Sequence, residues 1–340
     1  MTARELAFTA PKTVSIERTA RPRPSEDELL IETEYSGISP GTELLIYRDQ
    51  APSDLPADAT IDALQGSLTY PIRYGYSVVG EVIETGASVV GDWLGRRVFA
   101  FHPHGEHVTL PPASVVPVPS DIPGPRATLL PTAETAVNFM MDAGPMVGER
   151  AIVFGQGPVG LLTTALLADH PLGSVDAVEP LNSRRSLADR LGADRTYRPR
   201  DIPADPGTSD GDVPAGGDAD LTFELSGNPS ALQAALSVTG YAGRVLIGSW
   251  YGERPAALEL GGRFHRSRIR LLSSQVSTVD PTHRGRWDKD RRLDVAWERL
   301  RDERIDAMIT HQIPFEDASR AYQLLDARPD EAIQVVLTYD

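Results

Sequence analysis

The sequence predicts an α/β protein with two domains: a β-rich, barrel-like domain and a doubly wound parallel sheet. Three observations lead to this prediction. Residues 1–125 hold short β-type runs separated by glycine and proline, such as SVVGEVIETG and RRVFAF. From about residue 126, strand-like and helix-like segments alternate, which is typical of a parallel sheet covered by helices. A glycine-rich turn, GQGPVG at 155–160, joins the first such strand to its helix.

The elements follow one another clearly along the chain. In the first 125 residues we expect strands in ELLIETEYSGIS, SVVGEVIETG, RRVFAF and EHVTLP, with a loop or short helix inserted at 49–70. Helical periodicity then appears in RATLLPTAETAVNFMMDAG. After the glycine turn, SVDAVEP, ADLTFELSG, GRVLIGSW and SRIRLLSS read as strands with helices between them. The Asp-, Gly- and Pro-rich residues 200–218 predict a mobile surface loop.

The composition is that of a globular protein. Of 340 residues 41% are hydrophobic, and there is no run of 18 apolar residues. The N-terminal stretch lacks the apolar segment of a signal peptide, so we expect a soluble, cytoplasmic protein. Cysteine is absent, which excludes disulfides, thiolate nucleophiles and cysteine-ligated zinc.

The protein is strongly acidic. Its formal net charge is −15, and lysine occurs only at Lys12 and Lys289. Such a surface repels nucleic acid and anionic membranes, so neither is expected as a partner. The acidity suits a halophilic, salt-rich cytoplasm, and it equally suits a GC-rich genome that favours arginine and aspartate.

The glycine turn predicts a dinucleotide site. Gly155 permits the tight turn, Gly157 lets the backbone approach a pyrophosphate, and Gly160 allows the helix to pack closely on the strand. Glu179 ends the next strand, where a carboxylate accepts hydrogen bonds from the adenosine ribose. Glu179 therefore favours NAD(H) over NADP(H), although Arg184 or the neighbouring Arg185 could reach a 2′-phosphate.

Several motifs carry a resemblance to a known family. They are SGISPGTE (36–43), RYGYSVVG (73–80), VFAFHPH (98–104), ETAVN (134–138), GSWYG (248–252) and LGGRFHRSRIRLLSSQVS (260–277). With the order of elements, they make the whole chain resemble the medium-chain dehydrogenase/reductase superfamily. The motifs are similar to those of an alcohol dehydrogenase-like branch that includes bacteriochlorophyllide a dehydrogenase.

This resemblance implies an architecture and a cofactor site. Residues 1–125 would form a GroES-like β-barrel catalytic domain, residues 126–274 a Rossmann domain, and residues 275–340 a segment returning to the catalytic domain. A homodimer is implied as well. The residues expected to hold NAD(H) are Gly155, Gly157, Pro158, Val159, Gly160, Glu179, Arg184, Ser226, Gly227, Gly248 and Ser249.

The chain departs from the zinc enzymes of that superfamily. Their Cys-Gly-Thr-Asp ligand motif corresponds to residues 39–43, Ser-Pro-Gly-Thr-Glu, and their His-Glu pair corresponds to Tyr76 and Ser77. The four-cysteine structural lobe is missing, so we expect no zinc. As an alternative, the HPHGEH stretch at 102–107 could hold another divalent ion through its histidines and glutamate.

Without zinc, hydrogen-bonding groups must move the proton. Thr42 stands where the superfamily has its hydroxyl relay residue, or it caps the following turn. Tyr76 is a candidate proton donor, or it only fills the vacated position. His102 and His104 are candidate general bases, or ordinary loop histidines.

Other polar groups leave alternatives open. Glu134 either lies near a third ligand position, or caps its helix or anchors an arginine. His265 with Arg266 and Arg268 binds an anionic group or a neighbouring subunit, or forms a salt-bridge cluster.

Together these features predict an NAD(P)(H)-dependent oxidoreductase that interconverts an alcohol and a carbonyl without zinc. Aromatic residues at Tyr76, Trp250 and Tyr251 suit a medium or large, even aromatic, substrate. A zinc-free quinone or enoyl reductase is one alternative. A non-catalytic dinucleotide-binding redox sensor is another.

Overall fold

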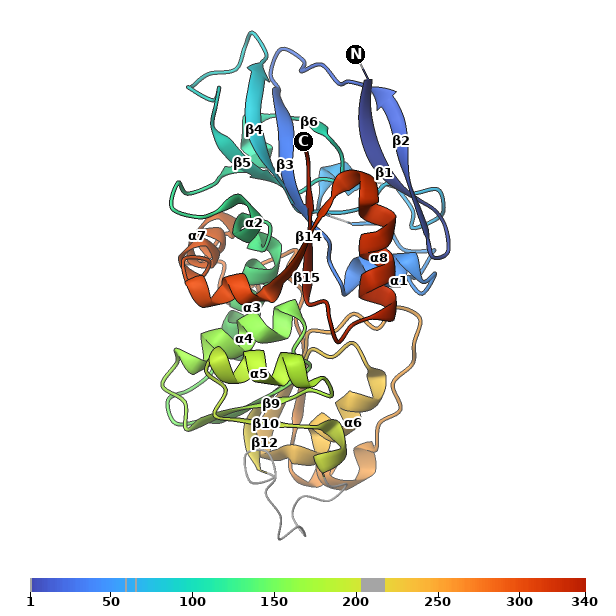
Figure 1. The fold of residues 1–340 in the computed structure, drawn as a ribbon. Helices are drawn as coiled ribbons and strands as arrows, with labels where there is room; N and C mark the ends of the chain where they lie inside the picture. Colours follow the sequence, from blue (N-terminus) through green and yellow to red (C-terminus); the bar gives the residue numbers. More distant parts are fainter. Residues whose placement is uncertain (1, 59, 65, 203–217) are drawn as a thin grey trace. The chain divides into compact units, whose positions relative to one another are not determined.

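The chain forms two compact units in the computed structural model, which describes residues 2–58, 60–64, 66–202 and 218–340 (Figure 1). Unit 1 comprises Met1–Pro131 and Ile309–Asp340, and unit 2 comprises Thr132–Met308. Most of the predicted surface loop, residues 203–217, lies outside the described residues. None of the described helices is long and apolar enough to cross a membrane.

Unit 1 is built from β-sheets and short helices. Its seven-stranded sheet has the order β14-β15-β3-β4-β5-β7, with β6 paired to β3, and a separate two-stranded sheet joins β1 to β2. The strands are β1 (Thr2–Ala10), β2 (Thr13–Ala20), β3 (Leu29–Gly37), β4 (Val78–Thr85), β5 (Arg97–Ala100), β6 (His107–Leu110), β7 (Val115–Pro117), β14 (Ile309–Pro314) and β15 (Gln334–Thr338). The helices are α1 (Thr42–Tyr47), α2 (Gly124–Ala127) and α8 (Ala318–Ala327).

Unit 2 contains a six-stranded parallel sheet of order β10-β9-β8-β11-β12-β13. Its strands are β8 (Arg150–Phe154), β9 (Ser174–Val178), β10 (Arg195–Tyr197), β11 (Ala219–Glu224), β12 (Thr239–Ile247) and β13 (Arg270–Ser273). Its helices are α4 (Pro158–Ala168), α5 (Asn182–Arg190), α6 (Pro229–Val238) and α7 (Lys289–Arg299), and α3 (Leu130–Ala143) leads into it. The predicted fold class, a β-rich domain with a doubly wound parallel sheet, is confirmed.

The parallel sheet has apolar residues on both faces because side chains alternate along each strand. Ile152 of β8 packs in one cluster with Leu232 of α6. The next residue, Val153, packs in another cluster with Phe139 of α3 and Leu167 of α4. The strand order reverses between β8 and β11, so the carboxyl ends of these strands form the switch point where ligands bind in such sheets.

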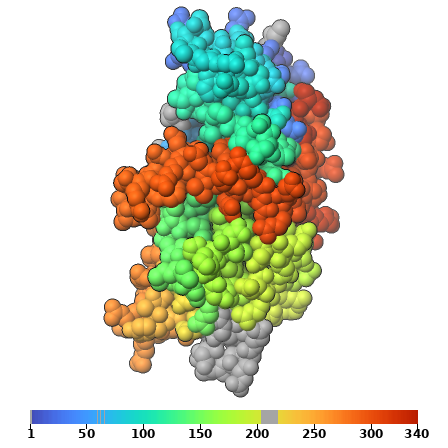
Figure 2. Space-filling view, turned by 90° about the vertical axis from the view of Figure 1, so that its left-hand side faces the viewer, coloured from blue at the N-terminus to red at the C-terminus, as the bar shows by residue number. Residues whose placement is uncertain are grey.

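The end of the parallel-sheet unit differs from the predicted boundary. The chain rejoins unit 1 at Ile309, not at about residue 275. Residues up to 308 stay with unit 2 because Arg292 of α7 is fully buried and binds Glu134 and Asn138 of α3. Figure 2 shows the orange-red segment containing α7 lying against the green segment that begins unit 2. Glu134 and Arg292 are 158 residues apart in the sequence, so no local sequence pattern could predict their contact.

Candidate active site

The glycine turn in unit 2 has the geometry of a dinucleotide cradle. Gly155 has φ +87°, and a Cβ there would lie 2.4 Å from the Cα of Ser226. A Cβ on Gly160 would lie 1.9 Å from the carbonyl oxygen of Gly155. Gly157 is different, because its nearest neighbour would be Nη1 of Arg184 at 3.9 Å. Gly155 and Gly160 thus keep the turn closed, while Gly157 leaves open space beside the start of α4.

Helix α4 presents unpaired backbone N–H groups at that space. It begins at Pro158 after an N-cap glycine with no side-chain cap, and Val159 follows in its first turn. Backbone N–H groups at a helix N-terminus attract phosphate. The residues present therefore fit the pyrophosphate of a dinucleotide.

Glu179 is held at the carboxyl end of β9, 3% exposed. Its Oε2 accepts a hydrogen bond from the backbone N of Gln156 at 2.8 Å, and its Oε1 accepts one from Leu181 N at 3.0 Å. Each oxygen keeps a further lone pair for a ribose hydroxyl. The carboxylate thus links the glycine turn to the strand where the adenosine ribose is expected.

The two arginines after Glu179 have different surroundings. Arg185 donates to the carbonyl oxygens of Glu179 and Pro180 and to Oδ1 of Asn182, so it supports the strand end. Arg184 instead places Nη1 beside Gly157. Burial lowers the pKa of Arg184, and Glu179 opposes that shift. Of the two, Arg184 is the one positioned to meet a phosphate.

The other predicted cofactor residues form two linked loops in unit 2. Gly227 N donates to Ser249 Oγ at 2.9 Å, which joins the loop after β11 to the loop after β12. Gly248 N and Ser249 N both donate to the carbonyl oxygen of Glu224, at 3.1 and 3.2 Å. Ser226 donates to the Glu224 side chain through its N–H and its hydroxyl. The predicted residues thus lie together, around a carboxylate that sequence reasoning missed.

In unit 1, Tyr76 belongs to a small cluster of hydroxyl groups. Its phenol donates to Ser39 Oγ at 2.5 Å. Burial raises the pKa of Tyr76, and hydrogen bonds with Ser39 and Thr42 partly offset the rise. Thr42 is the first residue of α1, and its backbone N donates to Ser39 Oγ at 3.4 Å. The phenol therefore keeps its proton at neutral pH and donates it in a hydrogen bond to Ser39.

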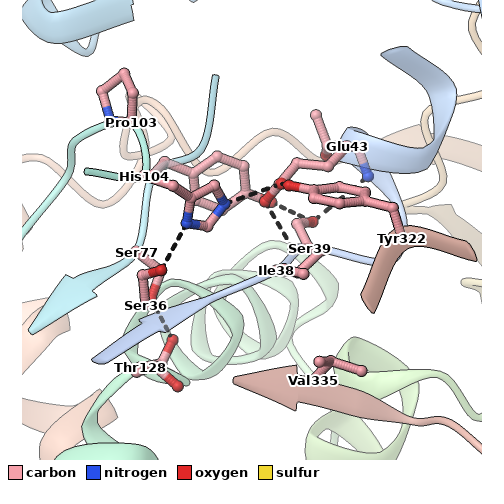
Figure 3. Close-up of polar contacts among 12 residues, drawn as sticks. Ser36, Ile38, Ser39, Glu43, Ser77, Pro103, His104, Thr128, Tyr322 and Val335 are labelled. Atoms are coloured by element: carbon pink, nitrogen blue, oxygen red, sulfur yellow. Dashed lines mark hydrogen bonds and ion pairs between the residues drawn. The ribbon is translucent and has the colours of Figure 1, made fainter. Parts of the chain in front are cut away.

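Glu43, the residue after Thr42, is the centre of a second network (Figure 3). Its side chain is fully buried. Oε1 accepts from Ser39 N at 2.8 Å. Oε2 accepts from the Tyr322 phenol and lies 3.1 Å from His104 Nε2. Because Ser39 is the partner of both Tyr76 and Glu43, the two groups of contacts are joined through one residue.

His104 links Glu43 to the sheet through both ring nitrogens, as Figure 3 shows. Its Nδ1 lies 2.7 Å from Ser36 Oγ, which lies 2.8 Å from the Tyr339 phenol. Since a carboxylate only accepts, Nε2 of His104 donates to Glu43, while Nδ1 lies within hydrogen-bond distance of the Ser36 hydroxyl. Burial raises the pKa of Tyr339, so its phenol keeps the proton that it donates to Ser36.

The glycine of the altered zinc motif makes room for this histidine. Gly75 has φ +130°, and a Cβ there would lie 2.6 Å from Cδ2 of His104. No other residue type fits both the backbone conformation and the contact. Gly75 is thus explained by its packing against the imidazole of His104, which lies in the segment between β5 and β6.

The other residues of HPHGEH have separate partners. His102 Nδ1 donates to Pro103 O at 2.9 Å, and burial lowers the pKa of His102. Glu106 binds Arg4, and His107 lies 3.6 Å from Glu32. In the described part of the chain no three His, Asp or Glu residues gather as metal ligands. The motif positions offer hydroxyls at Ser39 and Tyr76 instead, which do not fit the usual zinc ligand set.

The remaining candidates have ordinary surroundings or partners. Glu134 binds the buried Arg292 at 2.7 Å, so it anchors an arginine. Burial raises the pKa of Glu134, and Arg292 opposes the rise. Three basic side chains of the RFHRSR segment are exposed: His265, Arg266 and Arg268.

Sequence reasoning missed the acceptors and donors at the centre of the unit 1 network. Glu43 had a signal, because it is a charged residue inside the apolar helix TELLIY. A charge at such a position is buried only with partners. Ser36, Tyr322 and Tyr339 had none, since their partners are 68 to 303 residues away.

Comparisons with known proteins agree with this picture. A family model described as zinc-binding dehydrogenase matches residues 158–290. The chain is 24% identical over 355 residues to D-guloside 3-dehydrogenase of Escherichia coli K12, covering 99% of this chain and 100% of the relative. It is 29% identical over 263 residues to L-threonine 3-dehydrogenase of Pyrococcus abyssi, covering 68% and 71%.

A solved structure shares the fold along the whole chain. It is a short chain alcohol dehydrogenase from Escherichia coli CFT073 complexed with NADH, with TM-score 0.79, 18% identity and 99% of both chains covered. The family model, by contrast, matches a stretch that lies inside unit 2. Its description as zinc-binding therefore does not bear on residues 39–43 and 75–77 of unit 1.

Proposed function

We propose that this chain, which belongs to the medium-chain dehydrogenase/reductase superfamily, interconverts a carbonyl compound and an alcohol without the zinc ion usual there. The enzyme is an NAD(P)-dependent dehydrogenase. The observation that carries the zinc-free proposal is the Tyr76 phenol, held by Ser39 and Thr42 at the motif position of the zinc-binding histidine.

The residues of unit 1 supply the proton in this proposal. A nicotinamide cofactor held by the glycine turn and Glu179 would supply the hydride, with the electron pair for the new C–H bond at the carbonyl carbon. The carbonyl π electrons move to oxygen, and that oxygen takes the proton of Tyr76 as the O–H bond of the phenol breaks. The Ser39 hydroxyl accepts from the neutral phenol, and it turns to donate to the phenolate together with Thr42 once the proton has left. The phenolate then regains a proton from solvent.

The raised pKa of Tyr76 favours one direction. Because burial keeps the phenol protonated near neutral pH, Tyr76 is ready to donate to a carbonyl oxygen. Oxidation of an alcohol needs the ionised phenol as base, and burial disfavours that form. We therefore expect carbonyl reduction at neutral pH, and alcohol oxidation that becomes faster as pH rises.

The substrate proposal rests on aromatic surroundings and on the relatives. Tyr74 and Tyr76 of unit 1 meet edge to face, with ring centroids 6.2 Å apart. D-guloside 3-dehydrogenase is named for a sugar derivative. We accordingly infer a secondary alcohol or its ketone on a medium or large molecule, either aromatic or a glycoside.

NAD(H) is the preferred cofactor in this proposal. Glu179 is fixed by Gln156 and Leu181 beside the expected ribose, where its charge repels a 2′-phosphate. We expect NADH to bind at least tenfold more tightly than NADPH in fluorescence titrations. Arg184→Ala tests the role of that arginine. An equal loss of affinity for NADH and NADPH would mean that Arg184 contacts the pyrophosphate, whereas a loss of affinity for NADPH alone would mean that it contacts the 2′-phosphate.

The test of the proposal uses purified enzyme with measured metal content. NADH consumption is followed with aromatic ketones and oxidised glycosides, with and without a strong chelator. We expect turnover without stoichiometric metal. Tyr76→Phe should lower kcat by about 10²–10⁴ and leave NADH affinity unchanged. Activity that the chelator abolishes and zinc restores would overturn the zinc-free proposal.

A further inference from the structure

A second buried carboxylate lies in unit 2, where no motif drew attention to it. Glu224 is the last residue of β11, and its side chain is fully buried. It faces Phe154 of β8 on one side and Ile247 of β12 on the other, in the parallel register. Glu224 thus stands at the carboxyl edge of the sheet, directly beside the switch point.

The donors around Glu224 fix its state. Oε1 accepts from Ser226 N at 2.9 Å and from the Ser226 hydroxyl. Ser226 Oγ itself accepts from Asn228 N at 3.0 Å, so its own proton points to Glu224. Oε2 accepts from the Tyr251 phenol at 2.5 Å. All the groups that contact this carboxylate therefore act as hydrogen-bond donors.

Tyr251 cannot take over the negative charge. Burial, followed by the hydrogen bond to Glu224 and its charge, raises the pKa of Tyr251. The phenol therefore stays neutral over the working pH range. The fixed negative charge of this cluster belongs to Glu224.

The charge lies on the nicotinamide side of the dinucleotide site. The adenosine half of a bound cofactor would lie towards β9, where Glu179 is, so its nicotinamide half would lie across the switch point, towards β11 and β12. The loop after Glu224 touches the glycine turn, because Ser226 Cα lies 2.4 Å from a Cβ built on Gly155. The loop after β12 is tied to the same strand end through Gly248 and Ser249.

We propose that Glu224 is a positioning residue with an electrostatic role: its buried charge stabilises the oxidised, cationic nicotinamide relative to the reduced, neutral one. This inference rests on the NAD(P) dependence of the enzyme and adds to it a bias between the two cofactor states. Tighter binding of NAD⁺ relative to NADH makes bound NADH a stronger hydride donor. That bias acts in the same direction as the protonated Tyr76 phenol, which favours carbonyl reduction.

The charge can be removed with little change of shape. Glu224→Gln keeps the side-chain volume, and an amide can still accept from Ser226 and donate to the Tyr251 oxygen. Dissociation constants of NAD⁺ and NADH are measured for each variant, by calorimetry and nicotinamide fluorescence. We expect Glu224→Gln to raise the ratio of Kd(NAD⁺) to Kd(NADH) about three- to tenfold, as expected for loss of one charge in a partly screened site. No substrate is needed.

Two control variants separate charge from structure. Tyr251→Phe removes one hydrogen-bond donor to Glu224 but keeps the carboxylate. The ratio of Kd(NAD⁺) to Kd(NADH) should therefore change by less than about twofold, even if the affinities for NAD⁺ and NADH both fall. Glu149→Gln removes a buried carboxylate that binds Arg244 just before β8, towards the opposite edge of the sheet. It should lower stability without moving the ratio.

The outcomes are distinct. An equal loss of affinity for NAD⁺ and NADH in Glu224→Gln would make Glu224 only a loop brace and overturn the inference. An unchanged ratio with unchanged affinities would overturn it as well. If the wild-type protein bound neither NAD⁺ nor NADH, the proposed function itself would fail. That result is measured on the wild type, so it is distinct from any result obtained with a Glu224 variant.

Discussion

Glu43 in unit 1 and Glu224 in unit 2 are both fully buried, and both accept hydrogen bonds on each oxygen. Their partners differ in distance along the chain. Glu224 is bound by Ser226 and Tyr251, 2 and 27 residues away. Glu43 is bound by His104 and Tyr322, 61 and 279 residues away.

The difference has a structural consequence. The partners of Glu224 are loop groups next to the cofactor site, only partly buried, and water can replace the carboxylate there. The side-chain partners of Glu43 are the buried imidazole of His104 and the buried phenol of Tyr322, and water has no access to them. Its third partner, the backbone N of Ser39, is four residues away. Removing any member of the unit 1 cluster therefore leaves a buried partner without a hydrogen bond, whereas the loops around Glu224 in unit 2 can form hydrogen bonds to water instead.

The largest expected effect follows from this contrast. Glu43→Ala leaves His104 and Tyr322 buried without an acceptor, so we expect the free energy of unfolding to fall by about 3–5 kcal/mol. Glu224→Ala should cost about 1–2 kcal/mol, because its donors reach solvent. Urea unfolding of both variants measures the difference, with Tyr322→Phe as a milder control. Equal losses would contradict the contrast.

A second prediction concerns the glycine under His104. Gly75→Ala combines a positive φ with a Cβ 2.6 Å from the imidazole, and we expect a loss of about 2–4 kcal/mol of stability. Gly41→Ala is the matched control in the same unit. Its φ is −79°, and its Cβ would have no neighbour within 4 Å, so it should change stability by less than about 0.5 kcal/mol. Similar losses in thermal melts would show that His104 is not held there.

A third prediction separates folding from binding in the glycine turn. Gly157→Ala places a methyl group in open space, so stability should hold while NADH affinity falls about tenfold, close to 1.4 kcal/mol. Gly160→Ala puts a Cβ 1.9 Å from a carbonyl oxygen and should disturb both. Thermal melts and fluorescence titrations on the two variants test this. A Gly157→Ala variant with normal NADH affinity would mean that the phosphates lie elsewhere.

These contrasts explain what the sequence could predict. The cofactor site is made of backbone groups in one glycine turn and of strand ends, so spacing alone located Gly155, Gly160 and Glu179. The parallel sheet brought Gly227 and Ser249 together, because parallel strands end at one edge.

The site in unit 1 was predicted only in part. Residues in local motifs, Thr42 and Tyr76, were named, and their contact is now visible. His104 was predicted to be a general base or an ordinary loop histidine, and the structure places it as a buried link between Ser36 and Glu43. The reason is physical: the antiparallel sheet and α8 bring together side chains that no spacing rule connects.

The smallest expected effect concerns His102, which hydrogen-bonds only locally, to Pro103. Burial lowers the pKa of His102 in the folded state, and the hydrogen bond to Pro103 O partly opposes the shift. The unfolded chain therefore binds the proton more readily. Stability is complete above the unfolded pKa of about 6.5 and falls as pH drops below it towards the folded pKa, by at most about 1.4 kcal/mol per pH unit.

The check is urea unfolding at pH 7.5, 6.5 and 5.5. His102→Gln should lose less stability on acidification than the wild type, because the titrating ring is gone while the side chain can still donate to Pro103 O. His265→Gln, at an exposed position, is the control and should follow the wild type. If the free energy of unfolding changed with pH in the same way for all three proteins, His102 would reach water and stay free to act as a base. The unit 1 cluster would then include a second proton carrier beside Tyr76.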